Sequence, residues 1–334
     1  MPLRNSSLKT ARPGPDRFPI LLTWLLPALL LAACGAVPGP AAVLPAEAPP
    51  PLVSFVFDDG NDTDLLVAQP LFAAQGAVAS TAVTVDRIGT PEYLSAAQIR
   101  ELAGAGWEIM SHTVSHPRLT TLEPAAIDAE LARSKQELEA LGVPVANLVY
   151  PYNGNDAVVR EIAGRHYRAA RGGGRDFNRG VADRTLLKSF PLKHDSGAME
   201  RLVDQAFAER SWLIFYLHEV NAKLRLAAAR GEFLRGETLR FTPSGATGRF
   251  TVSHWFPLYG TSIYYVPLSG RPRPGDVVTG AVSGATAKFD DVMYDKPAQL
   301  TRLLAYIRER YPQMRIVTVD QGLDLLGVPA LARP

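Results

Sequence analysis

The stretch that decides how this sequence folds is residues 53–60, Val-Ser-Phe-Val-Phe-Asp-Asp-Gly. The apolar run from Leu52 to Phe57 has the length of a buried strand, and it ends directly in two carboxylates and a glycine. A second apolar run, Trp107 to Met110, ends close to His112 and His116. One oxygen ligand and two neutral imidazoles suit zinc or a similar divalent ion, and they leave positions open for water and substrate. The pattern therefore predicts a hydrolytic metal site whose second carboxylate is free to act as a base.

Further motifs follow in order along the chain, each at the end of an expected strand. They are Ser111-His112-Thr113-Val114-Ser115-His116-Pro117, Tyr150-Pro151-Tyr152-Asn153-Gly154 and Leu213-Ile214-Phe215-Tyr216-Leu217-His218. An H-E-x-x-H metalloprotease is excluded, because Thr113 occupies the position of its catalytic glutamate. In this order the motifs resemble those of the NodB-type polysaccharide deacetylases, carbohydrate esterase family four. The resemblance covers roughly residues 52–220 and resumes near the C-terminus.

The resemblance implies a role for each matching residue. Asp59, His112 and His116 would hold the divalent ion, expected to be Zn²⁺ with Co²⁺ or Ni²⁺ as alternatives. Asp58 would take a proton from the attacking water as general base, and His218 would protonate the leaving amine. These roles imply hydrolysis of an acetamido group with release of acetate.

The third motif departs from the family pattern. A backbone N–H at Tyr152 is expected to stabilise the oxyanion, but Asn153 separates Tyr152 from the glycine that usually follows directly. Val149 stands where the family usually has an arginine. Arg171 is the candidate that would supply this charge and orient Asp58, with an ordinary loop position as the alternative.

Strands and helices alternate from Leu52 onward. The expected strands are 52–57, 78–83, 107–110, 147–150, 167–170, 212–217 and 314–319, and the expected helices are 64–75, 95–105, 120–142, 156–164, 198–209 and 297–310. Thr120 with Glu123 predicts a capping box at the start of the third helix. Repeated βα units predict an α/β fold with a parallel sheet or barrel and chemistry at the carboxyl ends of the strands. The resemblance narrows this to an irregular (β/α)7-type NodB barrel.

An inserted β module is expected within this barrel. Residues 231–250 and 270–289 resemble each other, and such self-similarity marks a repeated structural unit. The module is therefore placed at 231–290, and the NodB domain at 52–222 and 291–328, where a helix and a strand close it. The module's aromatic residues either form its own core, which is favoured, or offer a surface on which sugars stack; they are Trp255, Tyr259, Tyr264 and Tyr265.

The first 33 residues resemble the signal peptide of a bacterial lipoprotein. A basic start is followed by the apolar run from Phe18 to Leu31, which is short for a membrane span, and then by Cys34. The resemblance implies cleavage before Cys34, lipid attachment to its sulfur and stable binding to a membrane. Gly35 favours the outer membrane facing the periplasm if the cell is Gram-negative. Residues 34–51, rich in alanine and proline, are expected to be a tether.

Charge and composition limit the classes of binding partner that the sequence suggests. The net charge is +2, and no basic stripe is interleaved with aromatic residues, so nucleic acid is not an expected partner. The expected substrate is an N-acetylated polysaccharide of the cell envelope or the extracellular space. Two other functions remain open at this point: a non-catalytic glycan-binding lipoprotein, and a metal amidohydrolase that acts on a small non-sugar amide.

Overall fold

The computed structural model describes residues 50–181, 183–256 and 260–331. The expected signal peptide, Cys34 and all but the last two residues of the tether lie outside this part of the chain. Within it, no helix combines the length and the apolar character that a membrane span requires.

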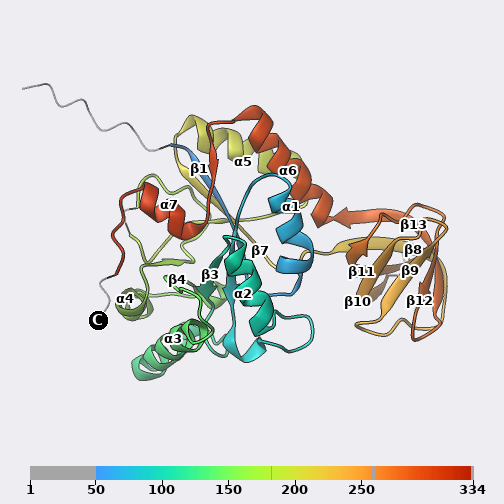
Figure 1. Cartoon of the computed structure of the whole chain (residues 1–334), viewed down its shortest axis with the longest axis horizontal. Helices are drawn as coiled ribbons and strands as arrows, with labels where there is room; N and C mark the ends of the chain where they lie inside the picture. The colour runs from blue at the N-terminus through green and yellow to red at the C-terminus, as the bar shows by residue number, and fades with distance from the viewer. Residues whose placement is uncertain (1–49, 182, 257–259, 332–334) are drawn as a thin grey trace, which may run out of the picture. The chain divides into compact units, whose positions relative to one another are not determined.

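An eight-stranded parallel sheet forms the part of the chain outside the inserted module (Figure 1), with the order β5-β4-β3-β2-β1-β7-β6 and with β14 paired to β1. The strands are β1 (Leu52–Phe57), β2 (Ser80–Val83), β3 (Glu108–Ser111), β4 (Asn147–Val149), β5 (Ala169–Arg171), β6 (Phe190–Pro191), β7 (Trp212–Leu217) and β14 (Arg315–Ile316). A bridge between Arg171 and Leu187 links β5 to the segment just before β6, so the two edges of the sheet approach each other. The irregular barrel expected from the sequence is thereby confirmed.

Side chains of β1 explain why this strand lies at the centre. All six residues are buried, and successive side chains point to opposite faces of the sheet. Val53, Phe55 and Phe57 join the larger apolar cluster with the surrounding helices, whereas Leu52 and Val56 join a second cluster with residues from other strands of the sheet. A strand buried on both faces reads as a continuous apolar run, which is how the sequence presents it.

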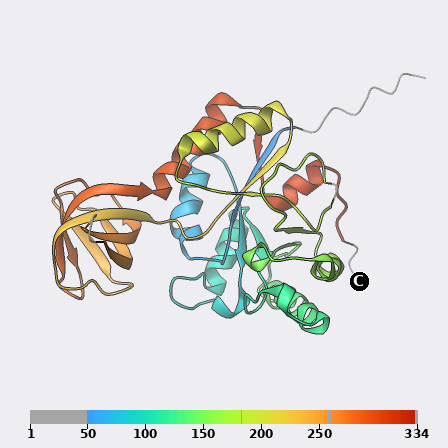
Figure 2. The same ribbon diagram turned by 180° about the vertical axis from the view of Figure 1, so that it is seen from behind.

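Helices pack against both faces of the sheet. They are α1 (Gln69–Ala73), α2 (Ala96–Gly104), α3 (Pro124–Glu139), α4 (Ala157–His166), α5 (Ser196–Ala208), α6 (Lys296–Arg310) and α7 (Val319–Leu325), and a π-helical turn, η1 (Asp64–Ala68), precedes α1. The reverse view shows α5 and α6 side by side, as in Figure 1 (Figure 2). Ser95 and Gln98 form a complete capping box at the start of α2.

Three details of the expected secondary structure are wrong. The N-cap of α3 is Glu123, which makes no side-chain cap, because the chain around Thr120 forms a short 3₁₀ turn, η3 (Leu119–Thr121), before the helix begins. The last strand stops at Ile316, since Thr318 caps α7 in a box with Gln321. Strand β6 was not expected, because two residues carry no periodicity.

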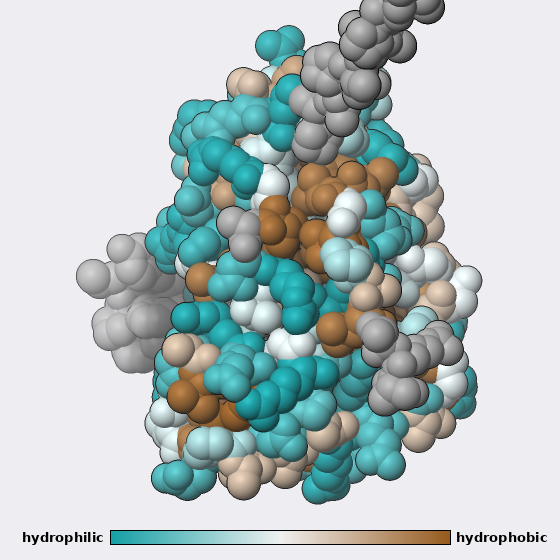
Figure 3. Space-filling model, turned by 90° about the vertical axis from the view of Figure 1, so that its left-hand side faces the viewer, coloured by the Kyte–Doolittle hydropathy of each residue, from teal (hydrophilic) through white to brown (hydrophobic). Residues whose placement is uncertain are grey.

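Helix α7 packs against the second apolar cluster. Val319 and Leu323 are buried in it, and the partly buried Leu325, Leu326 and Val328 pack against it. Figure 3 shows the side of the molecule on which α7 lies, where hydrophobic residues gather within a largely hydrophilic surround. The C-terminal segment thus completes the core around the parallel sheet.

The inserted module is a closed antiparallel barrel with the strand order β10-β11-β8-β13-β12-β9. Its strands are β8 (Ala222–Arg230), β9 (Thr238–Thr242), β10 (Thr247–Phe256), β11 (Gly260–Ser269), β12 (Val277–Gly280) and β13 (Thr286–Asp295). The expected limits, 231–290, are therefore too narrow: the sequence repeat begins only after β8, the strand that pairs with both β11 and β13.

The two repeats of the module exchange hydrogen bonds. Glu237 in the first repeat accepts from the backbone N–H groups of Val282 and Ser283, at 2.9 and 3.0 Å. Asp276 in the second repeat accepts from the backbone N–H of Ser244, at 3.2 Å. This reciprocity explains why each repeat carries both an acidic residue, Glu237 or Asp276, and a Ser-Gly-Ala-Thr turn, at 244–247 or 283–286.

The module has an apolar core, and of the two candidate aromatic residues whose side chains the structure describes, one lies in it. Tyr265 is buried there with Phe241 and Phe289. Tyr264 lies outside the core cluster, with the Lys223 ammonium 5.0 Å from its ring centroid. The side chain of Trp255 and all of Tyr259 lie outside the described part of the chain.

Candidate metal centre

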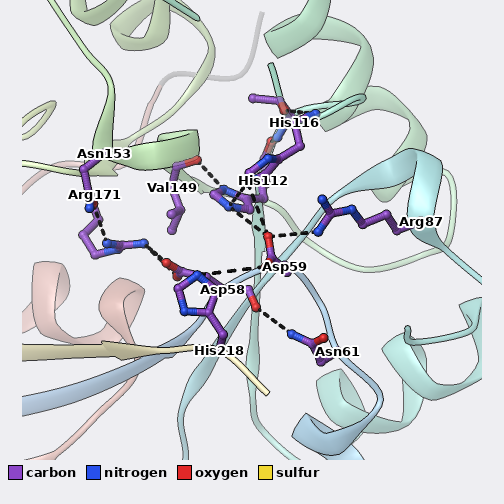
Figure 4. A network of polar contacts seen from close by, with 12 residues as sticks. Asp58, Asp59, Asn61, Arg87, His112, His116, Val149, Asn153, Arg171 and His218 are labelled. Carbon is purple, nitrogen blue, oxygen red and sulfur yellow. Dashed lines mark hydrogen bonds and ion pairs between the residues drawn. The ribbon is translucent and has the colours of Figure 1, made fainter. Parts of the chain in front are cut away.

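Polar side chains from five strands meet at the carboxyl end of the sheet (Figure 4). Strand β1 leads into Asp58 and Asp59, β3 into His112 and His116, β4 into Tyr152 and Asn153, β5 ends in Arg171, and β7 leads into His218. Parallel strands deliver their carboxyl ends to one edge, so residues far apart in the sequence come together there. All seven candidate residues expected from the sequence lie at this edge.

Asp59, His112 and His116 form a three-residue cluster of ligand atoms that lie within 4.8 Å of one another. The Asp59 Oδ1 atom is 3.3 Å from His116 Nε2 and 3.6 Å from His112 Nε2. The two Nε2 atoms are 3.1 Å apart. Asp59 Oδ1 is buried and makes no hydrogen bond, and besides the Arg87 guanidinium, 3.1 Å away, it faces the two imidazole nitrogens. A facial set of one oxygen and two nitrogens fits a divalent cation such as zinc.

The environment of the two histidines keeps their rings neutral, as metal ligands must be. His112 Nδ1 lies 2.8 Å from the carbonyl oxygen of Val149, a contact that assigns the proton to Nδ1 and leaves the Nε2 lone pair for a metal. Burial lowers the pKa of His112 well below its usual value, and it also lowers the pKa of His116. Both rings are thus predisposed to coordinate a metal in the neutral form rather than to take up a second proton.

The loop that carries the histidines is held in a strained conformation. Thr113 and His116 have φ angles of 67° and 60°. The Thr113 Oγ1 atom accepts from the backbone N–H of His116 at 3.0 Å, and Glu130 on α3 accepts from the N–H groups of Val114 and Ser115 at 2.9 and 3.1 Å. Non-glycine residues at positive φ persist only where their surroundings hold them. Glu130 is a supporting residue that the sequence gave no reason to select.

Asp58 is held by Arg171 rather than turned toward the ligand cluster. Arg171 Nη2 donates to both oxygens of Asp58, at 2.7 and 2.6 Å, and Nη1 donates to Asn153 Oδ1 at 2.9 Å. Burial raises the pKa of Asp58, and the charge of Arg171 opposes this shift. The guanidinium also lies over the ring of Tyr216, 4.7 Å from its centroid. Tyr216 therefore packs against the arginine that orients Asp58.

His218 and Tyr152 border the site on its accessible side. The His218 side chain is 56% exposed, and its Nε2 atom is 4.0 Å from Asp59 Oδ2. Tyr152 has a φ of 58° and is 58% exposed. Its ring centroid lies 4.7 Å from that of His116 and 4.8 Å from the guanidinium carbon of Arg118. Both residues can therefore meet a ligand that enters from solvent.

Two further contacts at the site were not expected from the sequence. Arg87, on the short 3₁₀ turn η2 (Val85–Arg87), places Nη1 3.1 Å from Asp59 Oδ1. Asn61 Nδ2 donates to the backbone oxygen of Asp58 at 3.1 Å. Arg87 stands in no motif, so no sequence signal could have singled it out. Asn61 follows the first motif directly, and proximity in sequence was its only signal.

Comparisons with known proteins find matches to part of this chain. The family described as polysaccharide deacetylase matches residues 46–169. YxkH of Bacillus subtilis strain 168, whose name assigns it provisionally to the polysaccharide deacetylases, is 33% identical over 84 residues, which are 25% of this chain and 30% of that protein. A gellan lyase of Bacillus sp is 41% identical over 75 residues, 22% of this chain and 3% of that protein. The chain thus spans less than a third of either curated relative.

Two solved structures match most of the length of this chain. A structure titled T48 deacetylase with substrate is 14% identical, with a TM-score of 0.46, and the match covers 84% of this chain and 94% of that one. The Xyl-CE4 domain of a multidomain xylanase from the hindgut metagenome of Trinervitermes trinervoides is 12% identical, with a TM-score of 0.46, and the match covers 85% of this chain and 95% of that one.

Proposed function

For a chain that carries a polysaccharide deacetylase domain of the NodB type, we propose a metal-dependent N-deacetylase. It hydrolyses acetamido groups of a polysaccharide that contains N-acetylglucosamine, in the cell envelope or outside the cell, and it releases acetate. One observation supports this most directly: the buried carboxylate of Asp58, which Arg171 holds, lies beside a cluster of three potential metal ligands. A protein that only binds glycans has no use for this combination.

The residues divide the hydrolysis among themselves. A divalent ion held by Asp59, His112 and His116 would polarise the acetamide carbonyl and lower the pKa of a water molecule. Asp58 accepts the proton of the attacking water, and Arg171 keeps both of its oxygens in a fixed orientation. As the carbonyl carbon becomes tetrahedral, the backbone N–H of Tyr152 is the proposed donor to its oxygen.

Departure of the amine completes the reaction. An amide nitrogen leaves readily only when it is protonated, so a general acid is required on the leaving-group side. His218 is the proposed acid, because its ring is half exposed at the border of the site and can meet the sugar nitrogen of a bound polymer. The C–N bond breaks, the nitrogen takes the proton from His218, and the products are acetate and a free amino sugar.

Zinc is the proposed metal. The donor set of two imidazoles and one carboxylate with further open positions is typical of catalytic zinc, and it also accepts cobalt or nickel.

The N-terminal segment leads us to propose that the protein is an exported lipoprotein. Acyl chains on Cys34 would anchor it to a membrane, at the outer membrane facing the periplasm in a Gram-negative cell, and residues 35–51 would act as the tether. Replacement of Cys34 by Ala should move the protein from the membrane fraction to the soluble fraction. Because Cys34→Ala can retain the apolar leader, fatty-acid labelling decides the question: a wild type that takes up no label would disprove lipid anchoring at this residue.

Acetate release is the test of the proposed activity. The protein that starts at Gly35 is incubated with N-acetylglucosamine oligomers and with peptidoglycan, with and without a chelator and with added zinc. We expect release that the chelator abolishes and zinc restores. A protein that binds zinc and retains glycan in a pull-down but releases no acetate would instead be a glycan-binding protein. Release from simple acetamides alone would indicate a small-molecule amidohydrolase.

A further inference from the structure

Two loops frame the ligand Asp59, and they are joined to each other. The first continues from Asp59 to Asp62, and the second leads from Val85 to Leu94. Asn61 and Tyr93 form an antiparallel bridge, the N–H of Asp62 donates to the oxygen of Glu92 at 3.0 Å, and the N–H of Leu94 donates to the oxygen of Gly60 at 2.9 Å. The loops therefore form one unit beside the candidate metal centre.

Two arginines of the inserted β module form ion pairs with this unit. Arg249 on β10 donates from Nη2 to Asp62 Oδ1 at 2.8 Å, and its Nη1 contacts the second oxygen of the same carboxylate. Arg235, just before β9, donates from Nε to Glu92 Oε1 at 3.1 Å and from Nη2 to Glu92 Oε2. Both pairs are bidentate, which fixes orientation as well as distance. The first pair is largely buried, with side-chain exposures of 17% and 11%, whereas Arg235 is exposed.

Both pairs connect to Asp58 and Asp59 through residues that neighbour them in the loops. Beside Asp62, Asn61 donates to the backbone oxygen of Asp58 at 3.1 Å. Beside Glu92, the ring of Tyr93 lies 5.1 Å from the guanidinium of Arg87. Arg87 Nη1 in turn is 3.1 Å from Asp59 Oδ1.

The loops need such support. Asp59 and Glu92 have φ angles of 78° and 73°, which non-glycine residues adopt only when the surrounding structure holds them. Backbone hydrogen bonds join the two loops to each other. The arginines of the module add side-chain contacts at Asp62 and Glu92.

We propose that the β module is a positioning element of the catalytic centre: Arg249 and Arg235 hold the two loops in the geometry in which Asp59 binds metal and Asp58 meets substrate. The inference rests on the proposed deacetylase function for its kinetic consequences, but its effect on metal binding does not. A module that only bound polymer would not need ion pairs to the loop that carries the proposed metal ligand Asp59.

The test compares Arg249→Gln and Arg235→Gln with Arg240→Gln, which changes an exposed arginine on β9. Each variant of the otherwise intact chain is titrated with zinc against a chromogenic chelator. Its kcat and KM are measured on a short N-acetylglucosamine oligomer and on polymer, and its Tm is recorded. Since small displacements of catalytic groups are costly, Arg249→Gln should lower kcat on the oligomer roughly ten- to hundredfold. Because Arg235 is exposed, its ion pair is weaker, and Arg235→Gln should lower kcat on the oligomer about two- to fivefold.

Both variants should also bind zinc more weakly, whereas Arg240→Gln should behave as the wild type and Arg249→Lys should recover part of the loss. If kcat and zinc affinity stay unchanged while KM rises on polymer alone, the module is a binding accessory and the proposal fails. Should Arg249→Gln not fold, the exposed Arg235→Gln decides between these results. If the wild type releases no acetate, the proposed function fails, and the zinc affinities still decide whether the module positions the site.

Discussion

Arg171 Nη2 lies 2.7 and 2.6 Å from the two carboxylate oxygens of Asp58, and the arginine is fully buried. The charge that holds the proposed base thus comes from the end of β5. In the family pattern the equivalent arginine is expected on the neighbouring strand β4, where this chain has Val149. The Val149 side chain is buried instead, and its carbonyl oxygen accepts a hydrogen bond from His112 Nδ1. The same function is served from an adjacent strand of the same sheet edge.

Replacement of Arg171 by Met should therefore impair both catalysis and stability. Removing one partner of a buried ion pair leaves an uncompensated charge and typically costs about 3–5 kcal/mol. Loss of the orientation of Asp58 should lower kcat on the order of a hundredfold. Acetate release and urea unfolding measure the two effects. The exposed Arg175→Met is the control, and a variant at position 171 that kept wild-type kcat would show that Asp58 needs no orienting charge.

Asp58 and His112 should separate catalysis from metal binding. Asp58→Asn keeps the shape of the side chain but removes the base, so zinc should stay bound while turnover falls about 10²–10⁴-fold. His112→Ala removes a ligand, so zinc and turnover should both be lost. Metal content by elemental analysis and acetate release distinguish the two variants. Loss of zinc from Asp58→Asn would indicate that Asp58 is itself a ligand.

Much of the fold was predictable from the sequence, because strong local patterns specify it. The apolar runs of β1 and β7 are both long and buried, and their boundaries agree with those expected. Strand β6 and helix α7 are short, and their position depends on packing against the rest of the sheet, which a single sequence does not display. The repeat located the module, but β8 lies outside the repeat and became visible only through its pairing with β13.

The candidate site was predictable where its residues stand in motifs. Arg171 was suggested by the missing arginine, whereas Arg87 and Glu130 come from segments without any motif. Their roles depend on loop conformations, including positive φ angles at Asp59 and His116, that follow from long-range contacts rather than from local preference.

Glu237 should be a main support of the module. It accepts hydrogen bonds from three backbone N–H groups and from the hydroxyl of Ser283, at 2.7 to 3.0 Å. Burial favours the neutral form of Glu237, but these bonds lower its pKa to about 2, so it is charged in the folded protein. Hydrogen bonds to charged groups are each worth about 1.5–3 kcal/mol, so Glu237→Ala should cost at least about 2 kcal/mol.

Urea unfolding and limited proteolysis check this expectation. Cleavage of Glu237→Ala should appear first in the turn at residues 281–284, which loses its anchor. The exposed Glu232→Ala is the matched control. Equal stability of the two variants would show that the reciprocal bonds between the repeats do not hold the module together.

Glu108, at the start of β3, should make stability depend on pH. Its carboxylate accepts from Ser80 Oγ, from Asn147 Nδ2 and from the backbone N–H of Asp320, at 2.8, 2.7 and 3.0 Å. Burial raises its pKa from 4.5 to about 7 in spite of these donors. A carboxyl group with a raised folded-state pKa stabilises fully below its unfolded pKa, and this contribution disappears as the pH rises through the folded value.

The contribution of Glu108 should therefore decline between about pH 4.5 and pH 7, by roughly 2 kcal/mol once its partial exposure is allowed for. Glu108→Gln has no proton to lose, so the difference in unfolding free energy between wild type and variant should shift in favour of the variant over this range. Urea unfolding at pH 5, 6, 7 and 8 measures the difference, and the exposed Glu101→Gln corrects for other titrating groups. A difference that stays constant with pH would mean that the three donors keep Glu108 charged throughout, and that its burial costs less than the raised pKa implies.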